Sequence, residues 1–263
     1  MQASDDNSHS PRWGLVIGHP GHELRVWAWM RTAKPIVAIL TDGSGHGGHA
    51  RLDLSLGTVC AAKAIPSNWF GVATDREIYQ AIVGGNNGFF LRMSDVLAET
   101  LMFWGIEQVA GDAIEGYNPT HDLCRLMLDR AIRIIEAKQK SAIINYEFKL
   151  SSHPSADFGT ANALSMELSP SELAQKLADI KGYAAVAGGT LLAEVEQMAE
   201  AYGEASFGHE YLTPADAESQ LARLEQEKPF YETYGEKRVA SGHYELVIRY
   251  ARHIAPIARA LKT

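Results

Sequence analysis

Two histidines stand three residues apart where an apolar stretch gives way to a predicted helix. They are His19 and His22, within residues 16–23. A helix that begins near Gly21 would place His22 in its first turn and His19 in the preceding loop. Both imidazoles could then face one point above the carboxyl end of the strand, which is a spacing typical of metal ligands. His121, further along the chain, offers a third imidazole.

Short apolar runs alternate with helical patterns over the first 150 residues. The predicted strands are 13–18, 35–40, 69–72, 107–110 and 142–148, and the predicted helices are 24–32, 52–64, 78–82, 89–104 and 123–137. Uninterrupted apolar strands separated by helices predict an α/β fold with a doubly wound, mostly parallel Rossmann-like sheet. Sites in such sheets lie beyond the carboxyl ends of the strands, where His19, Asp42 and the loop 112–121 are expected to meet.

The pattern changes after about residue 150. Ser169-Pro170-Ser171-Glu172 is typical of a helix start, and helical patterns continue to 181, from 190 to 202 and from 242 to 261. We therefore expect a Rossmann-like metal-site domain at 13–150. A mostly helical C-terminal subdomain at 151–263 is expected to pack on it.

Composition narrows the class of protein. The 263 residues are 46% hydrophobic and carry a formal net charge of -8, which argues against a nucleic-acid backbone as the main partner. The first twelve residues lack the order of a signal peptide, and no apolar run is long enough to span a bilayer. A cytoplasmic protein with buried thiols is expected, and a homo-oligomer stays open.

The sequence resembles the LmbE-like or PIG-L-like zinc N-deacetylases, which remove acetyl groups from N-acetylglucosaminyl and related amino sugars. That family has a strand followed by His-Pro-Asp-Asp-Glu, a second strand ending in Thr-Asp-Gly, and a last ligand from His-Pro-Asp-His. The matching stretches here are His19-Pro20-Gly21-His22-Glu23, Thr41-Asp42-Gly43 and Asn118-Pro119-Thr120-His121, all within residues 13–150. Residues 232–236 and 242–256 are also similar to a bacterial subgroup linked to polysaccharide biosynthesis.

The resemblance implies one Zn²⁺ ion held by His19, His22 and His121, with His22 standing where an Asp ligand is usual. Zinc accepts three neutral imidazoles and keeps one position open for chemistry, although His-rich sites also take iron, nickel or cobalt. The implied activity is hydrolysis of an amide on an N-acetylated amino sugar or a sugar-bearing intermediate.

Gly21 stands where the resembled family has the Asp that serves as general base, and glycine carries no proton. Either another carboxylate takes the role, or metal-bound hydroxide attacks without a dedicated base, or the chain is a non-catalytic metal- or sugar-binding protein. Glu23 and Asp42 are the nearest candidates for handling the proton. In the alternative interpretation Glu23 stabilises a helix N-terminus and Asp42 closes a turn.

A glycine-rich loop after the second predicted strand offers substrate contacts. His46 and His49 suit sugar hydroxyls or a second metal ion, and His46 could also aid an oxyanion. Arg51 matches an arginine that binds the sugar or its phosphate in the resembled family, or else is an exposed helix charge. The glycines of this loop, at 43, 45 and 48, also satisfy the dinucleotide pattern G-x-G-x-x-G, which keeps a nucleotide cofactor as an alternative.

Three residues flank the proposed third ligand. Tyr117 could donate a hydrogen bond to an oxyanion or pack in the core, and Glu115 is a further candidate for substrate binding. Asp122 could orient a ligand imidazole or be an ordinary charge in the first turn of a helix.

Overall fold

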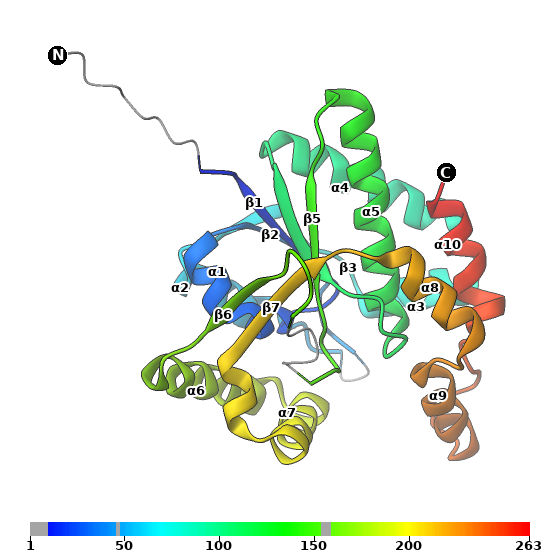
Figure 1. The fold of residues 1–263 in the computed structure, drawn as a ribbon. Coiled ribbons are helices and arrows are strands. Elements are labelled where there is room, and N and C mark those ends of the chain that lie inside the picture. Colours follow the sequence, from blue (N-terminus) through cyan, green and yellow to red (C-terminus); the bar gives the residue numbers. More distant parts are fainter. Residues whose placement is uncertain (1–9, 46–47, 154–158) are drawn as a thin grey trace.

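The predicted strands form the parallel part of one sheet. A computed structural model describes residues 10–45, 48–153 and 159–263. Within these ranges seven strands pair in the order β3-β2-β1-β4-β5-β7-β6 (Figure 1). Their bounds are β1 Trp13–Ile17, β2 Ile36–Thr41, β3 Ile65–Ala73, β4 Gln108–Asp112, β5 Ile144–Phe148, β6 Leu164–Glu167 and β7 His209–Pro214. The strands β1 to β5 pair in parallel, whereas β7 pairs antiparallel with β5 and β6 antiparallel with β7. The prediction of a mostly parallel α/β fold is confirmed.

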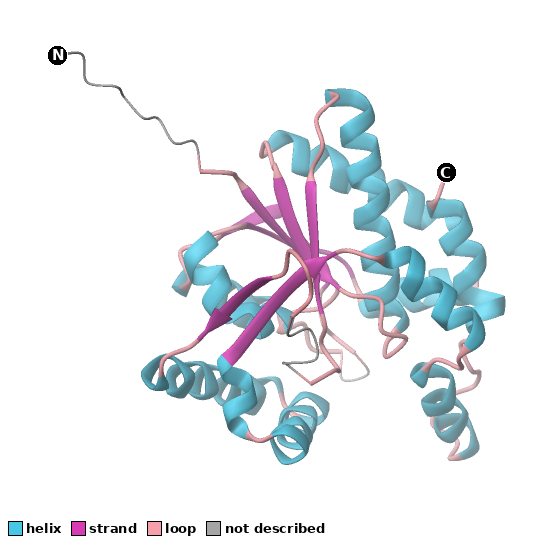
Figure 2. Cartoon of the chain, in the orientation of Figure 1, coloured by secondary structure: helices cyan, strands magenta, loops and turns pink. Residues whose placement is uncertain are grey.

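Helices cover both faces of this sheet (Figure 2). Their bounds are α1 Trp27–Ala33, α2 Leu52–Ala61, α3 Asp75–Val83, α4 Asn87–Phe103, α5 Pro119–Gln139, α6 Pro170–Ala187, α7 Gly189–Tyr202, α8 Ala217–Gln226, α9 Phe230–Ala240 and α10 Ala255–Leu261. The cluster on one face draws on α3, α4, α5 and α10, and the cluster on the other draws on α1 and α2.

The continuous apolar run of β1 reflects burial on both faces. Leu15 and Ile17 pack into the cluster with α1 and α2, whereas Val16 packs into the cluster with α4 and α5. Successive strand residues point to opposite faces, so a strand covered on both sides has no polar alternation. This is why the short apolar runs predicted the parallel strands correctly.

The chain beyond residue 150 adds two strands that the sequence analysis did not predict. Each of these strands is followed by a helix. The segment 242–249, however, is not helical, so the expectation of one long helix at 242–261 is wrong for its first half. A π-helical turn, Tyr250–Ile254, precedes α10 instead. The domain boundary near 150 stays a prediction.

Two further expectations can be compared with the structure. In the described ranges no helix is both long enough and apolar enough to cross a membrane. Both cysteines are free; Cys124 is buried as expected, but Cys60 is exposed.

A buried ion pair between Lys176 of α6 and Glu210 of β7 links the chain beyond residue 150 to helix α1. Glu210 on β7 accepts hydrogen bonds from the backbone N–H groups of Ala28 and Trp29, at 2.9 and 2.8 Å, and from Lys176 Nζ at 2.8 Å. The side chains of Lys176 and Glu210 are each 1% exposed. Strand β7, helix α6 and helix α1 therefore meet at one carboxylate.

Replacing Lys176→Met should lower the free energy of unfolding by roughly 3–5 kcal/mol, because a buried carboxylate loses its counter-ion. Chemical denaturation followed by circular dichroism measures the change. Lys181→Met is the matched control: Lys181 and Glu204 form a pair whose side chains are 58% and 53% exposed, so its loss should change stability by less than about 1 kcal/mol. Equal effects of the two substitutions would contradict this account.

Candidate metal centre

Three histidine rings meet at the carboxyl edge of the sheet. The strand order changes direction between β1 and β4, which is where ligands bind in open α/β sheets. His19 and His22 follow β1, and His121 lies in the first turn of α5 after β4. The ring centroids are 5.4 Å apart for His19 and His22, 5.0 Å for His19 and His121, and 4.4 Å for His22 and His121.

Local sequence explains how these rings are placed. Gly21 takes φ 106° and caps a 3₁₀ turn, His22–Val26, so that His22 is the first residue of the turn. Asn118 caps α5 by accepting the N–H of Thr120 at 2.8 Å, and proline follows at the first helical position. The placement of His22 and His121 in first turns follows from these caps.

His19 is held through one ring nitrogen and leaves the other available. Its Nδ1 lies 2.7 Å from Thr41 Oγ1 and 3.2 Å from Asp75 Oδ1. Its Nε2 is buried and has no hydrogen-bond partner among the described residues. The carboxylate beside Nδ1 favours the tautomer with the proton on Nδ1, which leaves the lone pair on Nε2.

His22 has the same arrangement with a second carboxylate. Its Nδ1 lies 2.9 Å from Asp112 Oδ2, and the same oxygen accepts the N–H of Gly18 at 2.7 Å. A Cβ atom at residue 18 would stand 3.1 Å from this oxygen, so glycine permits the close approach. Asp112 therefore favours the tautomer of His22 with the proton on Nδ1 and the lone pair on Nε2.

Burial keeps the third ring neutral. Desolvation lowers the pKa of His121 well below its usual value, and the positive charge that His22 and His19 can carry lowers it further. For Asp75, burial alone would raise the pKa, but the hydrogen bond and charge of His19 outweigh it and hold the pKa well below the usual range. Burial thus favours the neutral imidazole of His121, which is the form that binds a metal ion.

The residues present fit a zinc-type ion. Rings that share one tetrahedral zinc have centroids roughly 5 Å apart, given zinc–nitrogen bonds of about 2.0–2.1 Å, and the observed separations are close to this. The unpartnered Nε2 of His19 is the atom that a metal would satisfy. Across the described ranges, however, no three His, Cys, Asp or Glu side chains already form a ligand set, so the rings converge without being fully preformed.

Sequence reasoning missed Asp75 and Asp112 as orienting residues and Tyr183 as a neighbour. Both carboxylates lie at the carboxyl ends of strands, and that position was the available signal. Tyr183 comes from α6, and nothing in the local sequence relates it to the site. A Cβ atom at Gly21 would meet its ring at 3.3 Å, so the phenol fills the space that a side chain at residue 21 would need.

The two candidate proton carriers have backbone partners. Glu23 is fully buried and its Oε2 accepts the N–H of Gly21 at 2.8 Å, while its Oε1 has no hydrogen-bond partner in the described part of the chain. Burial raises the pKa of Glu23. Asp42 Oδ1 accepts the N–H groups of Ser44 at 3.0 Å and Asp75 at 3.3 Å and so shapes the turn after β2.

The residue expected to aid an oxyanion and those expected to bind substrate have different surroundings. Tyr117 lies with its ring centroid 6.4 Å from that of His121. Arg51 is partly buried and its Nε donates to the carbonyl of Gly43 at 2.8 Å. His49 is exposed, and His46 lies outside the described residues.

Two acidic residues organise loops around the site. Glu115 accepts hydrogen bonds from backbone N–H groups and hydroxyls of residues 150–152. Asp122 accepts the N–H groups of Glu115 and Gly116, at 3.1 and 3.2 Å, and burial raises its pKa to about 7. Asp122 thus accepts hydrogen bonds from backbone N–H groups of a loop, whereas the sequence analysis considered an imidazole as its partner.

The glycine pattern does not lie at the turn after the first strand, which is the position of a dinucleotide-binding fingerprint. Residues 43–48 follow β2 and not β1, and the next helix, α2, begins only at Leu52.

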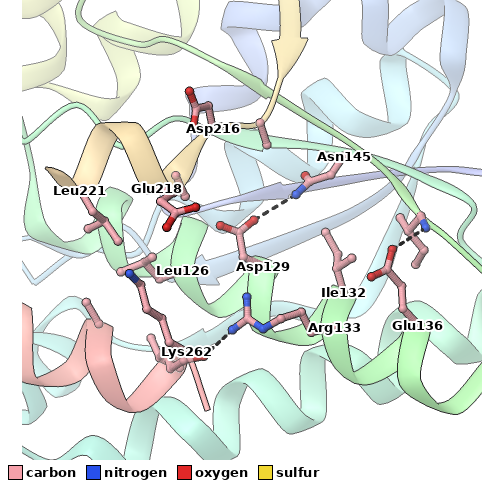
Figure 3. Close-up of a pocket in the computed structure, with 15 residues that line it drawn as sticks. Leu126, Asp129, Ile132, Arg133, Glu136, Asn145, Asp216, Glu218, Leu221 and Lys262 are labelled. Atoms are coloured by element: carbon pink, nitrogen blue, oxygen red, sulfur yellow. Dashed lines mark hydrogen bonds between the residues drawn. The ribbon is translucent and has the colours of Figure 1, made fainter. Parts of the chain in front are cut away.

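A separate pocket lies away from the histidines (Figure 3). It is formed by α5, α8, α10 and the amino end of β5. Several of its polar groups are paired with each other or with the backbone. Asn145 donates to Asp129, Arg133 donates to the carbonyl of Leu261, and the N–H of Ile143 donates to Glu136. The pocket is at the opposite edge of the sheet from His19. It therefore takes no part in the candidate site.

Comparisons with known proteins found similarity only to solved structures. No family model matches the chain, and no curated protein matches. A deacetylase triple mutant, Orf2*T, from the teicoplanin biosynthetic pathway is 14% identical and has a TM-score of 0.46, with 77% of this chain and 97% of that chain covered. The A40926 pseudoaglycone deacetylase Dbv21 is 12% identical with a TM-score of 0.48, covering 77% and 96%. The chain is similar in structure to deacetylases. At these identities and scores, the chemistry of the site rests on the residues of this chain.

Replacing Asp112→Asn should weaken zinc binding by roughly 10- to 100-fold. The amide oxygen can take the place of Oδ2 beside both the N–H of Gly18 and His22 Nδ1, but it carries no negative charge and therefore holds the ring proton at Nδ1 less strongly. Competition with a chromogenic zinc chelator measures the affinity. Asp95→Asn, at a remote pair with Arg130, is the matched control and should leave it unchanged. Unchanged affinity in Asp112→Asn would refute the orienting role.

The depressed pKa of His121 predicts a pH-dependent stability of the metal-free protein. The unfolded chain binds a proton at this residue below about pH 6.5, whereas the folded chain does not, so the free energy of unfolding should fall as pH drops from 6.5 toward the lower folded pKa. Asp122 works in the opposite direction, because its raised pKa favours folding at low pH and loses that effect as pH rises toward about 7.

Comparing wild type with His121→Gln isolates the histidine. Urea denaturation between pH 5 and 7.5, in the presence of chelator, should show a smaller loss of stability on acidification in the variant. Parallel pH profiles for the two proteins would mean that His121 is not held neutral by the fold.

Proposed function

We propose that this protein is a zinc-dependent amidohydrolase that removes the acetyl group from an N-acetylated amino sugar or a sugar-bearing intermediate. The observation that carries the proposal is the convergence of His19, His22 and His121, with two of the rings oriented by buried carboxylates. The resemblance in sequence supplies the substrate class. A cytoplasmic location belongs to the same proposal.

The chain's own residues have distinct tasks in this proposal. A zinc ion bound by the three rings would supply polarisation of the amide carbonyl and a water of lowered pKa. Asp75 and Asp112 hold the imidazole protons at Nδ1 of His19 and His22. The phenol of Tyr117, beside His121, is proposed to donate a hydrogen bond to the carbonyl oxygen as negative charge develops there.

Proton transfer needs a residue other than Gly21. Each candidate carboxylate has one oxygen that accepts backbone N–H groups, but Glu23 is fully buried, whereas Asp42 is half-buried. The raised pKa of Glu23 favours its protonated form, which suits it to give a proton to the leaving amine. We assign the proton to Glu23, with Asp42 as the alternative.

Substrate contacts are proposed on the loop after β2. Arg51 and His49 lie on or beside this loop and offer a cation and an imidazole to sugar hydroxyls or an anionic group. Glu115 is proposed to act through the segment 150–152 that it holds. The alternative function, a metal-dependent sugar-binding protein without catalysis, is favoured by the lack of a side chain at Gly21.

Metal analysis combined with an acetate-release assay on N-acetylglucosamine tests the proposal. Wild type should contain about one zinc ion per chain and release acetate, and His22→Ala should lose the metal and at least about 10²-fold in kcat/KM. His209→Ala, on the far strand β7, is the matched control and should keep both. Stoichiometric zinc without acetate release would favour the binding protein, and absence of tight zinc binding would refute both functions.

A further inference from the structure

A row of aromatic side chains runs outward from the candidate metal centre. It begins at Tyr117, which lies beside His121, and continues to Phe230 with ring centroids 5.0 Å apart and planes inclined by 5°. Phe230 leads to Tyr234 at 6.0 Å, and Tyr234 to Tyr244 at 6.4 Å. We call these four residues, Tyr117, Phe230, Tyr234 and Tyr244, the aromatic row.

Helix α9 presents part of this row along one side. Phe230, Tyr234 and Arg238 are spaced four residues apart, which places them on one face over about 12 Å of helix. Phe230 is 52% exposed and Tyr234 42% exposed, whereas Tyr231 is only 7% exposed. The exposed rings of Phe230 and Tyr234 therefore lie on the outer face of α9, whereas Tyr231 lies on its buried face.

A cation sits at the far end of the row. The guanidinium carbon of Arg238 is 6.0 Å from the ring centroid of Tyr234 and 5.5 Å from that of Tyr244. The row thus combines ring surfaces, phenol hydroxyls and a guanidinium.

Ion pairs hold α9 in place. Arg249 contacts the carboxylates of Glu232, at 3.0 Å, and Glu236, and Glu232 also accepts the N–H of Tyr250 at 2.7 Å. The helix is therefore tied to the segment that leads into α10, and the row has a defined position relative to the histidines. A pre-positioned surface loses less entropy when a ligand binds.

We propose that the aromatic row is a subsite for additional sugar rings of an extended N-acetylated glycan whose terminal or internal acetylated unit reaches the histidines. This inference rests on the proposed function and names the substrate as an oligosaccharide, not a free monosaccharide. The apolar C–H faces of sugar rings pack on aromatic rings, and their hydroxyls pair with phenol and guanidinium groups. The helical backbone of α9 is engaged in its own hydrogen bonds, so the row offers no edge to an extended peptide.

The test compares N-acetylglucosamine with its β-1,4-linked tetramer as substrates. Wild type should show a kcat/KM at least about tenfold higher for the tetramer, mainly through a lower KM. Tyr234→Ala should reduce this tetramer-to-monomer ratio by about tenfold, equivalent to about 1.4 kcal/mol, and Tyr234→Phe should preserve it. Phe103→Ala removes a ring that is 79% exposed on α4 and is the matched control, with no expected effect.

A ratio that is the same in wild type and Tyr234→Ala would overturn the subsite. If neither sugar is hydrolysed, the proposed function fails, and calorimetric titration with the tetramer decides the subsite separately. Binding to wild type that Tyr234→Ala weakens about tenfold would support the row as a glycan site. Absence of tetramer binding to wild type would overturn it.

Discussion

Two buried carboxylates determine which nitrogen of each neighbouring imidazole carries the proton. Asp112 accepts from Nδ1 of His22, and Asp75, with Thr41, holds Nδ1 of His19. Each contact leaves Nε2 as the ligating atom, and the burial of His121 keeps the third ring neutral. Without these partners the rings could take the other tautomer, and the same three side chains would offer protons instead of lone pairs. The chemistry of the site depends on this constraint.

The fold supplies the constraint by placing strand ends together. Asp112 ends β4, Asp75 follows β3, and His19 follows β1, so the carboxyl ends of parallel strands in one sheet bring donor and acceptor to the same edge. The later part of the chain completes the surroundings from two sides. Tyr183 of α6 occupies the space beside Gly21, and Phe230 of α9 stacks on Tyr117. Residues distant in sequence therefore decide how a substrate can approach the histidines.

Much of the parallel sheet could be predicted because its strands are buried on both faces and read as continuous apolar runs. The strand Leu164–Glu167 could not, since it lies at the sheet edge with three of its four residues exposed and has no apolar pattern. The three histidines were found from spacing and resemblance, and the structure brings their rings together. Tyr183 lies beside Gly21 only through a tertiary contact of α6, so its position required the fold. The assigned roles of Glu23, Asp42 and Tyr117 stay predictions.

X-ray absorption at the zinc edge of the metal-loaded protein tests the central claim most directly, because it reports the ligands without needing a substrate. The account predicts three imidazole nitrogens at about 2.0–2.1 Å together with a light-atom ligand from solvent. A zinc shell containing sulfur, or one with fewer than three imidazoles, would contradict a centre formed by His19, His22 and His121.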